Sequence, residues 1–60
     1  MYLICRNGRK VVTYDNLDQA KDMLKSLGLM WDKPIFDLVD NTTGEILETW
    51  EGGKRTYIAM

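Results

Sequence analysis

NLDQAKDMLKSLG, residues 16–28, is the segment with the clearest helical periodicity in the chain. Its apolar residues recur at steps of three and four and therefore share one face: Leu17, Ala20, Met23, Leu24 and Leu27. Asn16 is suited to cap the first turn, with Gln19 completing a capping box, and Gly28 is expected to end the helix as a left-handed C-cap. An amphipathic helix this short is marginal alone, so the flanking segments must supply the surface on which it packs.

The segments on both sides of this helix have the composition of β-strands. The expected strands are residues 1–5, 10–14, 35–40, 45–50 and 55–60. Asn7-Gly8 is the dipeptide most typical of a two-residue hairpin turn, Gly44 fits the left-handed position of a second turn, and Gly52-Gly53 indicates a third. The sequence therefore predicts one α+β domain over residues 1–60. We expect an antiparallel sheet of four to five strands with a single helix on one face, in the order ββαβββ.

The turns also predict which residues pair across the strands. In the first hairpin Arg6 is expected opposite Arg9 and Ile4 opposite Val11. Both faces of that hairpin are partly apolar, so the pattern does not indicate which one the helix covers. In the second hairpin the expected pairs are Asp40–Glu45, Val39–Ile46, Leu38–Leu47, Asp37–Glu48, Phe36–Thr49 and Ile35–Trp50. In the third the expected pairs are Trp50–Arg55, Glu48–Tyr57 and Leu47–Ile58.

These pairs divide the sheet into two faces. Phe36, Leu38 and Leu47 share an apolar face, which we expect to lie beneath the helix. Glu48 and Trp50 fall on the opposite face, which a single helix leaves uncovered. A shift of one residue in a hairpin would exchange the two faces.

The charge balance argues against strong attraction to an anionic surface, because the formal net charge is −1. The charges are unevenly spread: residues 1–13 carry three cations and no acid, whereas residues 31–60 carry six acids, namely Asp32, Asp37, Asp40, Glu45, Glu48 and Glu51. The single Cys5 excludes an internal disulfide, and the apolar run over residues 1–5 is too short for a signal peptide or a membrane span. We therefore expect a cytoplasmic location without membrane contact.

The composition excludes most catalytic and metal chemistry. There is no histidine, which removes the commonest general base and most zinc sites, and there is no glycine-rich phosphate loop. Asp37 opposite Glu48 could form an acid/base pair, but a 60-residue sheet with one helix offers little cleft for it. We predict no enzyme activity, no catalytic residue, no cofactor and no metal site.

The uncovered face carries the residue types that anchor protein interfaces. Tryptophan, tyrosine and arginine are frequent hot spots, and exposed apolar area of this kind marks a partner site. The predicted partner-binding residues are Ile35, Asp37, Glu48, Trp50, Arg55 and Tyr57. Trp50 is the expected anchor, with Arg55 packed against its ring, while Asp37 and Glu48 select a basic protein partner. Two other arrangements would cover the same face: a homodimer, or a second small core closed by Trp31 or by the first hairpin.

The charged residues leave two alternative functions open. Arg6, Arg9 and Lys10 on the first hairpin could contact nucleic acid while sheet-borne aromatic residues stack on bases. The negative net charge and the lack of a basic stripe argue against this alternative. The six acids of residues 31–60 could instead imitate a nucleic-acid backbone and occupy the basic groove of another protein.

Three segments succeed one another along most of the chain: the N-terminal Asn-Gly hairpin, a helix opened by NLDQAK, and the second hairpin PIFDLVDNTTGEIL. In this arrangement the chain resembles a type of short phage and bacterial accessory protein. Those members that have known roles bind and modulate a host protein. The resemblance therefore implies a modulator or inhibitor that acts by protein–protein contact, and it carries over no functional residue.

Overall fold

In the computed structural model, which describes residues 1–59, the strands form one antiparallel sheet. The strands are β1 (Tyr2–Arg6), β2 (Arg9–Tyr14), β3 (Phe36–Asp40), β4 (Ile46–Glu51) and β5 (Lys54–Ile58). Their order across the sheet is β2-β1-β3-β4-β5, so β3 is central and β2 and β5 are the edges. The expected α+β fold and the order ββαβββ are confirmed. Met60, the expected end of the last strand, lies outside the described residues.

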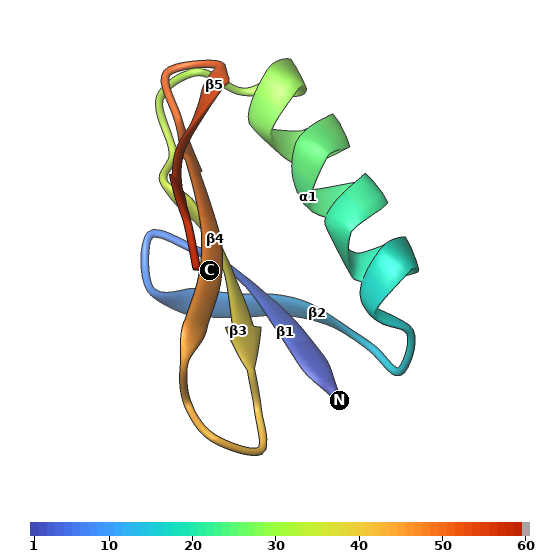
Figure 1. The fold of residues 1–60 in the computed structure, drawn as a ribbon. Helices are drawn as coiled ribbons and strands as arrows, with labels where there is room; N and C mark the ends of the chain where they lie inside the picture. The colour runs from blue at the N-terminus through green and yellow to red at the C-terminus, as the bar shows by residue number, and fades with distance from the viewer. Residues whose placement is uncertain (60) are drawn as a thin grey trace.

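Helix α1 (Leu17–Met30) packs on one side of the sheet (Figure 1). It begins where the sequence predicts, because the Asn16 side chain accepts a hydrogen bond of 3.1 Å from the Gln19 backbone N–H. The predicted end at Gly28 is wrong, since the helix continues to Met30 and its C-cap is Trp31. Within residues 1–59, no helix has the length and apolar character needed to cross a membrane.

Gly28 lies inside α1 because the helix approaches β4 closely at this point. A Cβ atom on residue 28 would lie 2.7 Å from Cβ, Cδ2 and Cε3 of Trp50. Glycine is the residue that permits such a backbone approach. The glycine that resembled a helix terminator therefore marks a point of close contact between the helix and β4.

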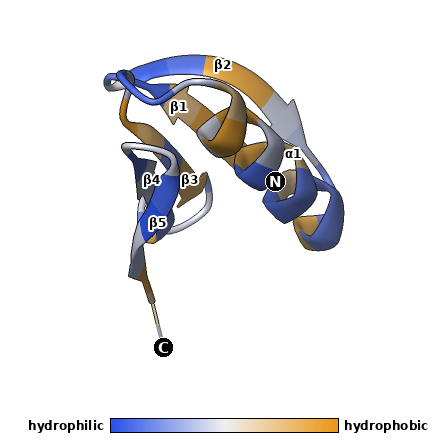
Figure 2. Ribbon diagram, turned by 90° about the horizontal axis from the view of Figure 1, so that it is seen from above, coloured by the Kyte–Doolittle hydropathy of each residue, from blue (hydrophilic) through white to orange (hydrophobic). Residues whose placement is uncertain are grey.

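The core lies between α1 and the sheet. Its buried apolar residues are Ile4, Ala20, Leu24, Phe36, Leu38 and Trp50. Polar and apolar residues alternate along α1, and its apolar side supplies Ala20 and Leu24 (Figure 2). Phe36 and Leu38 are buried beneath the helix as the sequence predicts.

Each hairpin keeps the pairing that its turn sets and then shifts by one residue at a β-bulge. In the first hairpin Arg6 pairs with Arg9 as expected, but Ile4 pairs with Val12 instead of Val11. Val11 is thus the extra residue of β2. The shift places Ile4 and Val12 together on the helix side, which settles the face that the sequence left open.

The second and third hairpins follow the same rule. Val39 pairs with Ile46 and Trp50 with Arg55, as predicted. Leu47 is then the extra residue of β4, so the observed pairs beyond it are Leu38–Glu48, Asp37–Thr49 and Phe36–Trp50. Thr56 is the extra residue of β5, which gives Thr49–Tyr57 and Glu48–Ile58. The predicted pairs beyond each bulge are therefore wrong.

Candidate functional site

The bulges divide the predicted partner-binding residues between the two sides of the sheet. Glu48 and Trp50 lie beneath α1 and are 5% and 8% exposed. Arg55 pairs with Trp50 and lies on the same side. Asp37 and Tyr57 both pair with Thr49 and face away from the helix. The six residues therefore do not form the single contact face that the sequence predicts, and the prediction of Trp50 as an exposed anchor is wrong. Ile35 precedes β3 and is 38% exposed.

The side of the sheet away from α1 is lined by two rows of paired residues. One row runs Lys10, Cys5, Asp37, Thr49, Tyr57, and the other runs Thr13, Leu3, Val39, Ile46. We call these residues the open face, because within residues 1–59 α1 is the one helix and it packs on the other side (Figure 1). Ile46 and Tyr57 are 43% and 49% exposed and border a shallow depression of about 460 Å³.

Asp37 lies near the middle of the open face on the central strand. Its Oδ1 accepts a hydrogen bond of 2.7 Å from the Thr49 hydroxyl, which fixes the carboxylate between its cross-strand neighbours Cys5 and Thr49. Burial and then the Asp37 carboxylate raise the pKa of the Cys5 thiol above its ordinary value, because both disfavour the thiolate. The negative charge of Asp37 therefore affects the ionisation of its neighbour Cys5 on this face.

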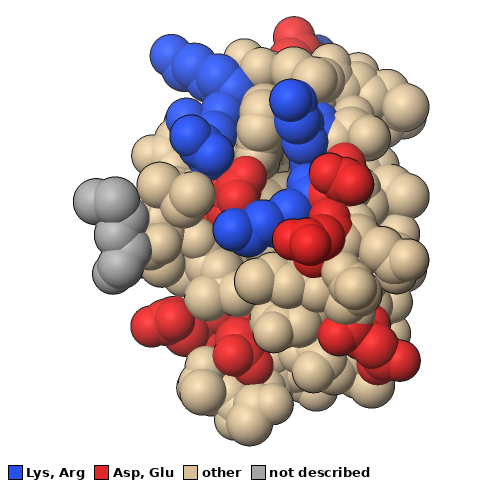
Figure 3. Space-filling view, turned by 45° about the vertical axis from the view of Figure 1, so that its right-hand side comes forward, with Lys and Arg blue, Asp and Glu red and all other residues tan. Residues whose placement is uncertain are grey.

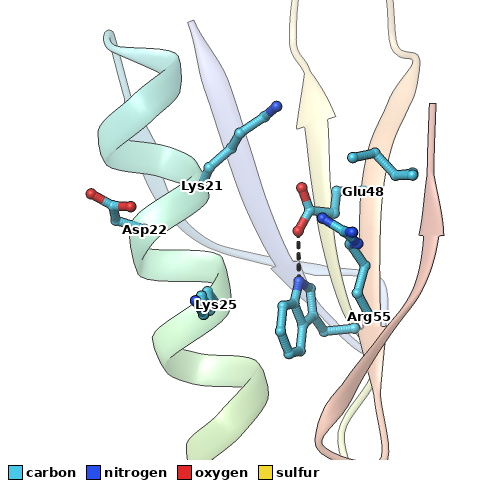
Figure 4. A pocket seen from close by; sticks show the side chains of 7 residues that line it. Lys21, Asp22, Lys25, Glu48 and Arg55 are labelled. Atoms are coloured by element: carbon cyan, nitrogen blue, oxygen red, sulfur yellow. Dashed lines mark hydrogen bonds between the residues drawn. The ribbon is translucent and has the colours of Figure 1, made fainter. Parts of the chain in front are cut away.

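A cleft of about 450 Å³ lies on the other side, between α1 and β5. Its lining residues are Lys21, Asp22, Lys25, Glu48, Trp50, Arg55 and Ile58. Figure 4 shows the Glu48 carboxylate on the sheet, and the Trp50 Nε1–H donates a hydrogen bond of 2.7 Å to its Oε2. Basic side chains gather around acidic ones on the face drawn in Figure 3. The cleft thus combines the buried Glu48 carboxylate with a border of three basic side chains and one acidic side chain, Asp22.

The residues of the nucleic-acid alternative do not form one surface. Arg6 and Arg9 pair with each other and border a small depression of about 260 Å³ beside Asn7. Lys10 pairs with Cys5 and belongs to the open face on the opposite side. The Arg6 guanidinium lies 6.0 Å from the centroid of the Trp31 ring, so it makes a cation–π contact within the chain.

Sequence reasoning missed several residues of these sites. Trp31, which the sequence offers as a group that closes a second small core, is 52% exposed and is the accessible tryptophan instead of Trp50. Lys21 and Lys25 are not among the predicted site residues, although their spacing of four residues indicates that they lie on the same side of the helix. Val39 and Ile46 pair on the uncovered face, as the sequence predicts. The side of Leu3 could not be predicted, because both faces of the first hairpin are partly apolar.

Within residues 1–59, the structure brings together no group of three or more histidine, cysteine, aspartate or glutamate residues that could hold a metal ion. Comparison of the chain with protein-family models, with curated proteins and with solved structures gave no match.

Proposed function

We propose that this chain is a non-catalytic binding module that acts by protein–protein contact through the open face. The observation that supports this proposal is the combination of accessible apolar residues with one fixed carboxylate on that face. Leu3, Val39 and Ile46 form a continuous apolar row on three neighbouring strands. An apolar patch on a small domain is typical of a partner site, and tyrosine, here Tyr57, is a frequent anchor of interfaces.

Charge defines the kind of partner. The Thr49 hydroxyl holds the Asp37 carboxylate, and Lys10, the cation of the same row, lies on the edge strand β2, two strands away. A partner that covers Asp37 with apolar groups alone would bury the carboxylate without an ion pair, at a cost of several kcal/mol. A partner that presents a lysine or arginine to Asp37, surrounded by apolar residues, removes that cost. We therefore infer a partner with a basic group at the centre of an apolar surface.

The same charge disfavours a second copy of the chain. Asp37 lies on the central strand, so a two-fold arrangement of two open faces brings two Asp37 carboxylates into one small interface. Like charges in an apolar interface repel each other strongly. A standard interface buries about 800 Å² on each partner, which is roughly a fifth of the 4206 Å² surface of this molecule. A partner of standard size would therefore cover about a fifth of the surface of this molecule.

The resemblance to phage and bacterial accessory proteins adds the expectation that binding modulates the partner's activity. A small domain that covers a basic, apolar surface on another protein can block whatever that surface does. This consequence rests on the proposed contact and needs no chemistry in the chain itself.

The test compares matched variants of one purified, tagged chain. Ile46→Asn removes an exposed apolar residue from the open face, whereas Met30→Asn removes one, 69% exposed, from the end of α1. The bait is applied to nuclease-treated lysates of the source and of its host, and each retained protein is identified and purified. We expect one such protein to bind the wild type and Met30→Asn equally, and to bind Ile46→Asn and Asp37→Asn at least tenfold more weakly, about 1.4 kcal/mol.

Circular dichroism must show that the variants remain folded. The proposal is wrong if every purified protein binds Ile46→Asn as well as the wild type, or if no protein is retained. It is also wrong if sedimentation shows a dimer of the chain that Ile46→Asn dissociates. Nucleic acid that co-purifies without nuclease, and is lost in Arg6→Gln and Arg9→Gln, would favour the basic hairpin instead.

A further inference from the structure

We propose that the cleft between α1 and β5 binds a small zwitterion of the amino-acid class. Its ammonium group would meet the Glu48 carboxylate, and its carboxylate group would meet Lys21, Lys25 and Arg55. This site opens on the helix side of the sheet, so it is independent of the contact proposed for the open face.

The first observation is a buried acceptor with an unused oxygen. Glu48 is 5% exposed, and its Oε2 accepts the hydrogen bond from the Trp50 indole. Every fully buried side-chain polar atom of residues 1–59 has a hydrogen-bond partner. No donor among these residues bonds to Oε1, so this atom is reached by solvent from the cleft. In Figure 4 this oxygen points away from the indole.

The second observation is that the acceptor is held rigidly. Trp50 lies against Gly28 of α1, where the close contact leaves no room even for a methyl group. Because the indole is fixed by the helix, its N–H fixes one oxygen of Glu48 and leaves the other in a defined direction. Because this acceptor is already held in position, little conformational entropy is lost when a ligand binds to it.

The third observation is the basic border. Lys21 and Lys25 lie one turn apart on α1, and Arg55 lies on β5 across the cleft. Asp22 also lines the cleft, but in Figure 4 its carboxylate points away from Glu48. Figure 4 shows the Arg55 guanidinium on the side of Glu48 and Trp50. An anion without a donor group would meet the Glu48 charge, and a cation without an acid group would meet the three basic side chains. A zwitterion satisfies both at once.

The remaining walls indicate the side chain of the ligand. The Trp50 ring and Ile58 are apolar, and the cleft volume of about 450 Å³ falls within the range of small-molecule sites. An amino acid with an apolar side chain, such as leucine, therefore matches the cleft. Because the site is open to solvent, we expect a dissociation constant on the order of 1 mM.

The test uses tryptophan fluorescence with L-leucine as the probe. Trp31→Phe leaves Trp50 as the single tryptophan, so the signal reports on the residue that contacts Glu48. We expect saturable binding of L-leucine and at least about tenfold weaker binding of N-acetyl-L-leucine, which lacks the ammonium group, and of L-leucinamide, which lacks the carboxylate.

Three variants in this background locate the site. Glu48→Gln keeps an acceptor for the indole and removes the charge, and Arg55→Gln removes an exposed cation; we expect each to weaken L-leucine binding at least about tenfold. Lys33→Gln, an exposed cation outside the cleft, should change nothing. If Glu48→Gln does not fold, Arg55→Gln decides alone. The proposal is overturned if L-leucine binding does not saturate or if the three probes bind equally well. It is also overturned if folded Glu48→Gln or Arg55→Gln binds L-leucine as tightly as the Trp31→Phe background does.

Discussion

Gly28→Ala should destabilise this protein, although alanine is the better helix former. A helix interior gains about 1 kcal/mol when glycine is replaced by alanine. Against this gain, the new Cβ would lie 2.7 Å from three atoms of Trp50, including its Cβ, which cannot move without the backbone of β4. Overpacking of this kind costs about 1–3 kcal/mol. Displacement of the indole also strains its 2.7 Å hydrogen bond to Glu48, and a bond to a charged group contributes about 1.5–3 kcal/mol.

The overpacking and the strained hydrogen bond together exceed the helix gain, so we expect a net loss of about 1–2 kcal/mol. For a domain of this size that loss lowers Tm by about 5–15 °C. Thermal and urea denaturation followed by circular dichroism measure it. Ser26→Ala is the matched control, because Ser26 is exposed on the same helix and its replacement should raise the stability by a few tenths of a kcal/mol.

Gly28→Asn separates this explanation from the C-cap that the sequence predicts. Asparagine is tolerated at a left-handed C-cap better than alanine, so a C-cap at Gly28 would make the asparagine variant the more stable of the two. Close packing on Trp50 makes it the less stable, because a larger side chain must fit. A Gly28→Ala variant as stable as the wild type, or an asparagine variant more stable than the alanine one, would refute the packing argument.

Three further predictions follow from burial and local bonding. Trp50→Ala should cost about 3–5 kcal/mol in urea denaturation and Trp31→Ala less than about 1 kcal/mol, because Trp50 is 8% and Trp31 52% exposed; equal losses would contradict the assigned positions. Near pH 8 the Cys5 thiol should react with iodoacetamide more slowly than an exposed cysteine, because its raised pKa leaves a smaller fraction as thiolate. Asp37→Asn should lower the pKa of Cys5 and speed the reaction, and an unchanged or slower rate would contradict the charge effect. Asn7→Ala should lower the free energy of unfolding by about 1–2 kcal/mol, because Asn7 has φ of 51° and its Oδ1 accepts a 2.9 Å hydrogen bond from the Ile35 N–H. Asn7→Gly should lose mainly the hydrogen bond and therefore lower it less.

The sequence predicted those features that local chemistry controls. The Asn16 cap fixed the start of α1, and the Asn7-Gly8 turn fixed the first pair of the first hairpin, Arg6 with Arg9. The order of the elements followed from alternating strand and helix patterns. Each of these features depends on residues within a few positions of one another, so the printed sequence contains the information needed.

The candidate sites were predicted less well, because they depend on the three bulges. The extra residues are Val11, Leu47 and Thr56, and none is the glycine that would mark a bulge. Each is a β-branched or apolar residue that suits either side of a strand. A bulge reverses the side of every residue beyond it, so correct turns still led to the wrong face for Glu48 and Trp50.

The choice between the two faces of β4 was decided by the indole of Trp50. Alternation alone favours burying Leu47 with Thr49, since the other choice places the Glu48 carboxylate beneath the helix, where burial is costly. A buried indole, however, removes about 150–250 Å² from water and requires an acceptor for its N–H. Glu48, two residues away on the same strand and the same side, supplies that acceptor at 2.7 Å. The acid is therefore the polar partner that allows the largest side chain of the strand to enter the core. As a consequence Asp37, and not Glu48, is the acid left on the open face.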